Sequence, residues 1–200
     1  MSAINFLVCG VGGQGTVVAS DILSSVGLTA GYQVKKSDVL GLAQRGGSVI
    51  SHIRWDTEPV HAPMVSLGEI DYMVAFERLE ALRRLPYMKP GGTVVVSAQE
   101  IHPISVTTGQ IAYPKHEELL QSLQRNVRRV FEIEALQTAL RIGNPKIVNI
   151  VLLGALSSLF PIESIIWEET VIEFVPSHHQ EINLNAFRAG RRLIKEGSAL

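Results

Sequence analysis

Cysteine is almost missing from this chain, because Cys9 is the only one among 200 residues. A single thiol excludes an internal disulfide, a zinc ribbon and an iron–sulfur cluster held by this chain alone, since each of these needs several cysteines. Cys9 ends an apolar run, where a small apolar side chain fits. We therefore expect it to pack in a buried strand and to be unreactive.

An excess of either charge is also missing, with 18 Lys and Arg against 19 Asp and Glu and a net charge of −1. Such a balanced surface argues against nucleic acid as a partner, because binding to phosphate backbones depends on clustered basic residues. The six histidines show no metal-ligand spacing: His178 and His179 are adjacent and the others are scattered. We therefore assign no metal to this chain.

Long apolar runs are missing as well. The most apolar segment, residues 147–156, is shorter than the ~20 residues that span a bilayer. It predicts a buried helix, with Asn144 as its N-cap and Pro145 at its first position. Without a signal-peptide pattern or a membrane span, we expect a cytoplasmic protein. No linker or repeat divides the sequence, so residues 1–200 are expected to form a single domain.

Hydrophobic periodicity predicts an α/β fold. A strand over residues 4–9, a glycine turn, a helix over residues 15–27 and a second strand over residues 32–36 would form a parallel βαβ unit. We expect a three-layer α/β/α domain with a mixed, mostly parallel sheet, a Rossmann-like start and a β-hairpin insertion. The other predicted elements are a hairpin of residues 48–55 with 59–63, strands at 71–76, 93–96 and 127–133, weaker strands near Ile104 and Ile111, and helices at 78–85, 117–124, 163–174 and 179–195.

The glycine turn reads "GVGGQG" and matches the spacing Gly10-x-Gly12-x-x-Gly15 of phosphate-binding turns. Such a turn lets the backbone approach an anion at the N-terminus of the next helix. The alternative is that the glycines serve packing only. If the loop binds a ligand, we expect Gly13→Ala to obstruct it and to spare the fold.

The second predicted strand does not end on the acidic residue that holds the ribose of NAD. Lys35 and Lys36 stand there instead, which leaves an NADP-like or other phosphorylated ligand open beside a merely solvated strand end. Further on, Arg45 precedes Gly46 and Gly47 and offers a planar donor fork for a phosphate or carboxylate. An exposed arginine at a flexible hairpin entry is the alternative.

Together, "GVGGQG" and "QRGGSV" resemble the gamma-type domain of the 2-oxoacid:ferredoxin oxidoreductases, and the resemblance runs over most of residues 4–195. The stretch "SDVLGLAQRGGSVISHIRW" and the "NAFRAG" of the last predicted helix are most similar to the beta subunits that act on indolepyruvate. By this resemblance the cofactor-binding residues form two loops, and none is catalytic. These residues are Gly10, Gly12, Gly13, Gln14, Gly15 and Thr16, then Arg45, Gly46, Gly47 and Ser48.

The resemblance implies a subunit of an enzyme that decarboxylates an aryl 2-oxoacid, reduces ferredoxin and transfers the acyl group to coenzyme A. Thiamine diphosphate, magnesium and the iron–sulfur clusters would lie on a partner alpha subunit, since this chain has neither a cysteine cluster nor a thiamine diphosphate motif. The chain would then be inactive alone, and a homo-oligomer of the isolated chain stays open. The alternatives are a stand-alone NADP-binding oxidoreductase and a nucleotide-binding regulatory module.

Four further features are candidates for a role in this complex. Glu77 and Ser97 follow predicted strands and would line the same crevice, or serve as a helix cap and a turn residue. For docking on the alpha subunit, we expect contributions from residues 59–64 and from Trp55, although Trp55 fits equally well inside the domain.

Overall fold

The computed structural model describes residues 3–41 and 46–196 of the chain. Within them, six strands form one sheet in the order β2-β3-β1-β4-β5-β6. Strands β1, β4, β5 and β6 run parallel, β3 is antiparallel to β1, and β2 is antiparallel to β3. The strands are β1 (Ile4–Val11), β2 (Gln33–Leu40), β3 (Ser48–Asp56), β4 (Ile70–Ala75), β5 (Met88–Ser97) and β6 (Arg129–Ile133).

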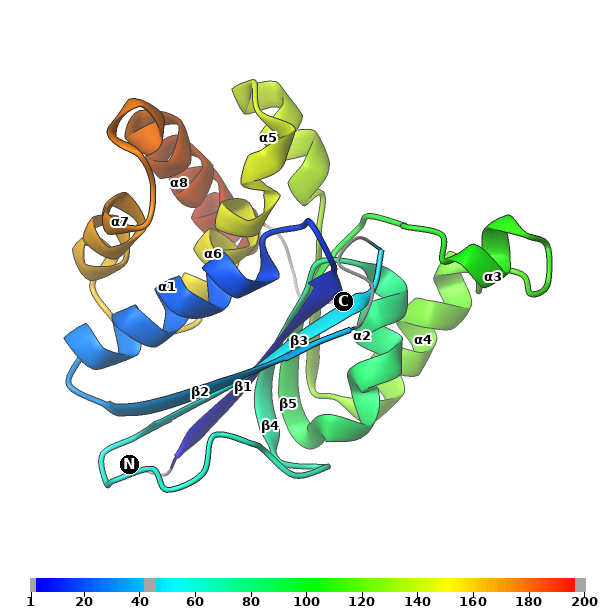
Figure 1. The fold of residues 1–200 in the computed structure, drawn as a ribbon, viewed down its shortest axis with the longest axis horizontal. Helices are drawn as coiled ribbons and strands as arrows, with labels where there is room; N and C mark the ends of the chain where they lie inside the picture. Colours follow the sequence, from blue (N-terminus) through cyan, green and yellow to red (C-terminus); the bar gives the residue numbers. More distant parts are fainter. Residues whose placement is uncertain (1–2, 42–45, 197–200) are drawn as a thin grey trace.

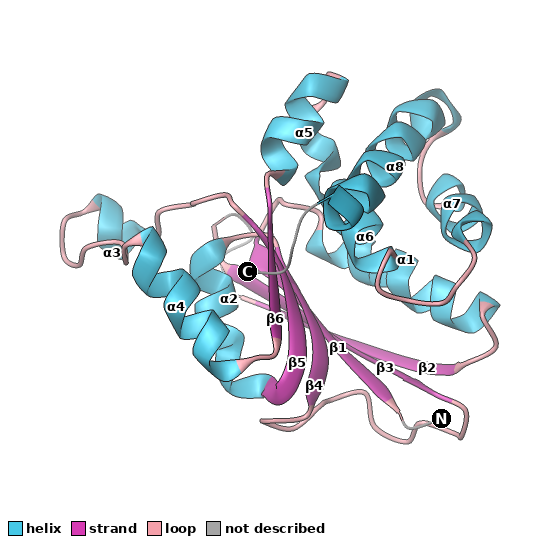
Figure 2. Cartoon of the chain, turned by 180° about the vertical axis from the view of Figure 1, so that it is seen from behind, coloured by secondary structure: helices cyan, strands magenta, loops and turns pink. Residues whose placement is uncertain are grey.

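Helices cover both faces of this sheet. Figure 1 and the reverse view in Figure 2 show α1, α6, α7 and α8 on one side and α2 and α4 on the other, with short α3 projecting from the body. The three-layer α/β fold with a mixed, mostly parallel sheet is confirmed. The helices are α1 (Thr16–Thr29), α2 (Arg78–Arg84), α3 (Ile104–Thr107), α4 (His116–Asn126), α5 (Ala135–Ile142), α6 (Val148–Ser157), α7 (Ser164–Glu173) and α8 (Gln180–Glu196), with 3-10 turns at Leu85–Tyr87, Pro145–Ile147 and Ser177–His179.

Strand alternation divides the core between the two faces. In β1, Phe6 and Val8 pack toward α1 and the α5–α8 group, whereas Leu7 and Cys9 pack toward α2 and α4. All four side chains are fully buried, which explains why β1 reads as a continuous apolar run. Burial also raises the pKa of Cys9, so its thiol stays protonated, in agreement with the expected lack of reactivity.

The predicted βαβ unit is wrong in one respect. The strand, glycine turn and helix are present, but β2 does not pair with β1, because antiparallel β3 lies between them. The hairpin is formed by β2 and β3, and residues 57–69 contain no strand that could pair with β3. A sequence pattern specifies which segments extend, but the choice of a pairing partner depends on the folded sheet.

Other local predictions also need correction. Ile104 lies in α3 and Ile111 lies in no strand, so the weak strands predicted there are wrong. The turn of α3 begins after Pro103 and ends before Gly109, which has a φ of 75°. Helix α5 was not predicted. Asn144 and Pro145 begin the 3-10 turn Pro145–Ile147 and not α6 itself, whose N-cap is Ile147; the Asn144 side chain caps this turn by accepting from the backbone N–H of Lys146 at 2.9 Å.

The helices that follow β6 pack through close backbone contacts. A Cβ on Gly190 in α8 would collide with the carbonyl of Val151 in α6, and one on Gly154 would collide with the carbonyl of Phe187. Both glycines therefore allow α6 and α8 to approach more closely than side chains would permit. None of the described helices is both long and apolar enough to cross a membrane.

Candidate functional site

Both glycine segments lie at the same edge of the sheet. The parallel strands end at this edge, β3 begins there with Ser48, and β2 ends there with Leu40, which is in register with Val49. The backbone N–H of Gly12 donates to the carbonyl of Gly47 at 2.8 Å, so the two segments are directly joined. The first glycine loop is defined as residues 12–15 and the second as residues 46–47.

β1 and β4 are neighbours in the sheet, but the helices that follow them lie on opposite faces. Helix α1, after β1, packs on one face, and α2, after β4, packs on the other. Open α/β sheets bind ligands beside such a reversal, at the carboxyl ends of the strands. The first glycine loop is located at this reversal, between the ends of β1 and β4.

Gln14 spans the gap between β1 and β4 with its side chain. Its Oε1 accepts from the Val11 N–H at 2.7 Å, and its Nε2 donates to the Phe76 carbonyl at 2.9 Å and to Gln99 Oε1 at 3.2 Å. Glycine at position 10 leaves room for this amide, since a Cβ there would lie 2.9 Å from Gln14 Oε1 and 3.0 Å from Phe76 Cβ. The amide of Gln14 thus holds the ends of β1, β4 and β5 together.

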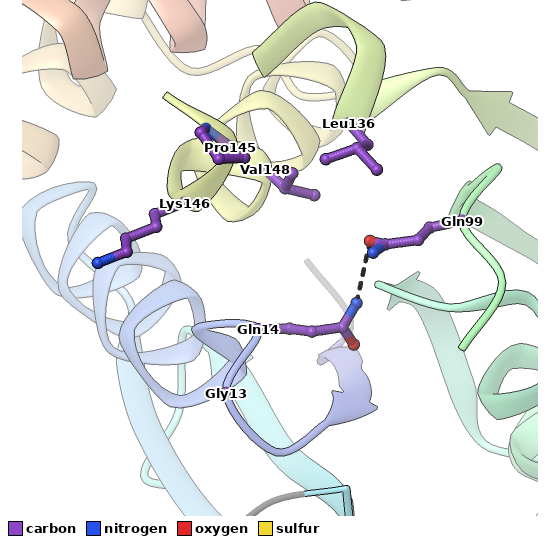
Figure 3. A pocket seen from close by; sticks show the side chains of 7 residues that line it. All are labelled: Gly13, Gln14, Gln99, Leu136, Pro145, Lys146 and Val148. Carbon is purple, nitrogen blue, oxygen red and sulfur yellow. Dashed lines mark hydrogen bonds between the residues drawn. The ribbon is translucent and has the colours of Figure 1, made fainter. Parts of the chain in front are cut away.

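A cavity of about 200 Å³ opens above this amide. In Figure 3, Gln14 and Gln99 point toward one another on one side, and Leu136, Pro145 and Val148 form the opposite wall. Exposed Lys146 and Gly13 complete the lining. The cavity therefore combines an amide floor and an apolar wall, and the Lys146 side chain extends from its rim away from the two amides (Figure 3).

The N-terminus of α1 is built to receive a negative charge. Gly15 is the N-cap residue, with a φ of 78°, and it offers no side-chain cap; no acidic residue lies in the first turn. The first amides of any helix have no partner within the helix. Thr16 is 3% exposed, and its Oγ1 is buried without a hydrogen-bond partner. Backbone amides therefore lie at the positive end of the helix dipole, and the Thr16 hydroxyl is buried behind them, beside Gly10.

Gly13 has a backbone conformation that the sequence did not predict. Its φ is 101°, although a Cβ there would meet no atom within 4 Å. The open space agrees with a ligand-facing position. The positive φ means that Gly13→Ala would strain the loop, so the expectation that this substitution spares the fold is wrong.

The second glycine loop borders another cavity, of about 180 Å³, lined by Gly46, α2 and residues 101–104. Ser48 begins β3 here and connects to α2: its Oγ donates to Glu80 Oε2 at 2.5 Å and accepts from Arg84 Nη2 at 2.9 Å. Arg45 lies outside the described residues, so its role stays a prediction.

Glu77 and Ser97 have structural roles in this region. Glu77 is 1% exposed and caps α2, accepting from the Glu80 N–H at 2.9 Å. Its other oxygen accepts from the Tyr113 hydroxyl at 2.5 Å. Burial and this carboxylate together raise the pKa of Tyr113, so its hydroxyl remains a donor. Ser97 is buried, and its Oγ accepts from the Gln99 N–H at 3.3 Å, as a turn residue does.

The docking prediction for Trp55 is wrong, because this side chain is fully buried and lies within ring-contact distance of Phe6. A Cβ on Gly27 of α1 would collide with the indole, so the ring is enclosed by the domain's own helix. The prediction for residues 59–64 stands as a prediction. This segment is largely exposed, at the opposite end of the sheet from the glycine loops.

Residues 5–193 match the family model described as pyruvate ferredoxin/flavodoxin oxidoreductase. The chain belongs to this family. Among relatives, it is 36% identical over 199 residues to the indolepyruvate oxidoreductase subunit IorB of Thermococcus kodakarensis, with 98% of each chain covered. The resemblance inferred from the two glycine motifs is therefore confirmed.

Solved structures of this family share the fold. The keto/oxoacid ferredoxin oxidoreductase gamma subunit of Geobacter sulfurreducens superposes with a TM-score of 0.72 at 21% identity, covering 97% of this chain and 99% of that one. The 2-oxoglutarate:ferredoxin oxidoreductase of Magnetococcus marinus, solved with 2-oxoglutarate, coenzyme A and succinyl-CoA bound, gives 0.78 at 22% identity. It matches this chain over its full length, which spans 32% of the Magnetococcus chain.

Membership of this family disfavours a stand-alone nicotinamide enzyme, and the geometry agrees. In a dinucleotide-binding fold, the second strand lies beside the first and presents its end to the ribose. Here β3 takes that place, and Lys36 lies within β2, where it forms ion pairs with Asp21 and Asp38. The sequence carries no signal for Gln99 or Glu80. Asn149, whose Nδ2 donates to the Gly15 carbonyl at 3.5 Å, could have been found, because it is the one polar residue inside an apolar run.

Proposed function

We propose that this chain is the small subunit of an oxidoreductase that acts on indolepyruvate and related aryl pyruvates with ferredoxin as electron acceptor. The observation that carries the proposal is the 36% identity, over 98% of both chains, to a subunit of an indolepyruvate oxidoreductase. The complex would convert the oxoacid oxidatively to an acyl-CoA, and this chain would complete it.

The redox groups of such an enzyme do not fit the described residues. The single cysteine of the chain is buried, and no group of three His, Cys, Asp or Glu among residues 3–41 and 46–196 is arranged to hold a metal. We therefore assign thiamine diphosphate, magnesium and the iron–sulfur clusters to a larger alpha subunit. This chain would be inactive without that partner.

The glycine loops fit a different role, which is to bind part of coenzyme A. The N-terminus of α1 supplies backbone amides for a phosphate or another anionic group, and the Thr16 hydroxyl, buried beside Gly10 without a partner, would turn toward that group on binding. The adjoining cavity, with its amide floor and the apolar side chains of Leu136 and Val148, suits an uncharged chain that carries amides. Gly13 leaves room for a ligand to extend from the N-terminus of α1 into this cavity.

Thr16→Val tests this assignment with little disturbance of the fold. The valine has the same shape and removes a buried hydroxyl that has no partner, so we expect thermal stability to stay the same or to rise. Calorimetry with coenzyme A should show affinity reduced about tenfold, as expected for one lost hydrogen bond to a charged group.

Ser122→Val is a matched control, since this hydroxyl lies on α4, away from the glycine loops, and donates to the Glu118 carbonyl. It should leave coenzyme A binding unchanged. Equal affinities for the parent and Thr16→Val would contradict the assignment of this helix N-terminus to coenzyme A. Copurification of the tagged chain with a large, iron-coloured subunit tests the complex itself, and recovery of the chain alone would count against it.

A further inference from the structure

One buried carboxylate near the second glycine loop has no counterpart in the sequence predictions. Glu80 lies in the first turn of α2 and is 1% exposed. Burial of an ionised carboxylate is costly unless charges and hydrogen bonds compensate it. Glu80 is compensated by Arg83 Nη1 at 2.6 Å, Arg84 Nη2 at 3.9 Å and the Ser48 hydroxyl at 2.5 Å.

Of these partners, Ser48 connects the carboxylate to the glycine loops. Its hydroxyl donates to Glu80 and accepts from Arg84, so its orientation is determined from both sides. Ser48 directly follows Gly47, whose carbonyl accepts from the Gly12 N–H at 2.8 Å. A continuous path of contacts therefore runs from α2 through the second glycine loop to the first.

Through this path, α2 contacts the glycine loops although it lies on the face of the sheet opposite α1. Helix α2 packs against the face of the sheet that α1 does not cover. Glu80 extends from α2 toward the sheet edge, where it lines the cavity of about 180 Å³ together with Val11 and Gly46. Glu80 and Ser48 therefore hold the Gly12–Gly47 contact from the α2 face of the sheet, whereas α1 lies on the other face.

We propose that Glu80 is a positioning residue, which holds Ser48 and Gly47 so that the two glycine loops keep the geometry in which they bind their ligand. The proposal rests on the proposed function, because the ligand in question is coenzyme A. Glu80 lines the cavity beside the second glycine loop but not the one assigned to coenzyme A. Its effect passes through the Gly47 carbonyl and the Gly12 N–H.

Amide hydrogen exchange of Gly12, followed by NMR on the full chain, tests the positioning step without any ligand. Glu80→Ala should accelerate this exchange about tenfold, because a lost hydrogen bond to a charged group loosens the loop by that order. Ser48→Ala breaks the same path and should have a similar effect, which provides a second variant if Glu80→Ala folds poorly. Ser48→Thr keeps the hydroxyl and should exchange like the parent.

Glu168→Ala is the matched control. Glu168 is also largely buried and paired with an arginine, since it accepts from Arg188 Nη2 at 2.5 Å. It lies on α7, which packs on the face of the sheet that α2 does not cover. It should lower stability to some extent without changing the Gly12 exchange rate. Unchanged exchange in both Glu80→Ala and Ser48→Ala would overturn the proposal, whatever the ligand is.

Steady-state kinetics of the complex with the alpha subunit test the functional step. Glu80→Ala should raise KM for coenzyme A about tenfold and change kcat and the oxoacid KM less than about twofold. A merely structural role would lower the amount of active complex and leave every KM unchanged, which would overturn the proposal. If Thr16→Val raises the coenzyme A KM and Glu80→Ala does not, this inference alone is wrong. If neither does, the failure extends to the proposed function.

Discussion

Gln14 is the residue whose substitution tests the architecture of the site most sharply. In Gln14→Leu the side chain keeps a similar volume but loses its bonds to the Val11 N–H, the Phe76 carbonyl and Gln99 Oε1. A net loss of about 0.5–1.5 kcal/mol for each bond, with added cost for backbone groups left unpaired, gives a destabilisation of about 2–4 kcal/mol. We expect the melting temperature to fall by roughly 6–12 °C for a domain of this size.

The assay is chemical or thermal unfolding followed by circular dichroism. Gln121→Leu is the matched control, because Gln121 is exposed on α4, and it should change the free energy of unfolding by less than about 0.5 kcal/mol. Gln99→Leu, which removes only the bond of 3.2 Å, should fall between the two. A Gln14→Leu variant as stable as the control would refute the view that this amide joins the strand ends.

Two further predictions concern packing and pH. Gly190→Ala should destabilise the fold by about 3 kcal/mol in urea unfolding, because the new Cβ would collide with the Val151 carbonyl. Asn185→Ala, on the exposed face of α8, is the control and should be neutral or stabilising. A stabilised Gly190→Ala would disprove the close contact between α6 and α8. Burial and, to a smaller extent, the charge of Arg84 lower the pKa of His52 in the folded chain. As pH falls below about 6.5, His52 therefore takes up a proton more readily in the unfolded chain than in the folded chain, and the free energy of unfolding should decrease. His52→Gln should flatten that part of the pH profile, and an identical profile would contradict the assignment.

The sequence predicted the elements better than their pairing. The continuous apolar run of β1, the glycine turn and the periodicity of α1 and α8 are local signals, and each led to a correct element. The neighbour of β1 is not local. Strand β3 alternates as a half-solvated hairpin strand would, yet it occupies an interior position, and its Trp55 is enclosed by α1.

The candidate site was predicted only where local motifs mark it. Gly12 and Gly47 were assigned to one site from their motifs, and the structure joins them by a hydrogen bond of 2.8 Å. The partners of Gln14 could not be found in this way, because Phe76 and Gln99 are 62 and 85 residues distant along the chain. Glu80 gives even less signal, since an acidic residue in the first turn of a helix is usually a solvated one.

The central claim is that this chain completes an indolepyruvate oxidoreductase whose redox centres lie on another subunit. The direct test is reduction of a viologen dye by the co-expressed complex, dependent on indolepyruvate and coenzyme A, with each subunit omitted in turn. We expect full activity from the pair and no activity from this chain alone or from the alpha subunit alone. Full activity from the alpha subunit without this chain would contradict it.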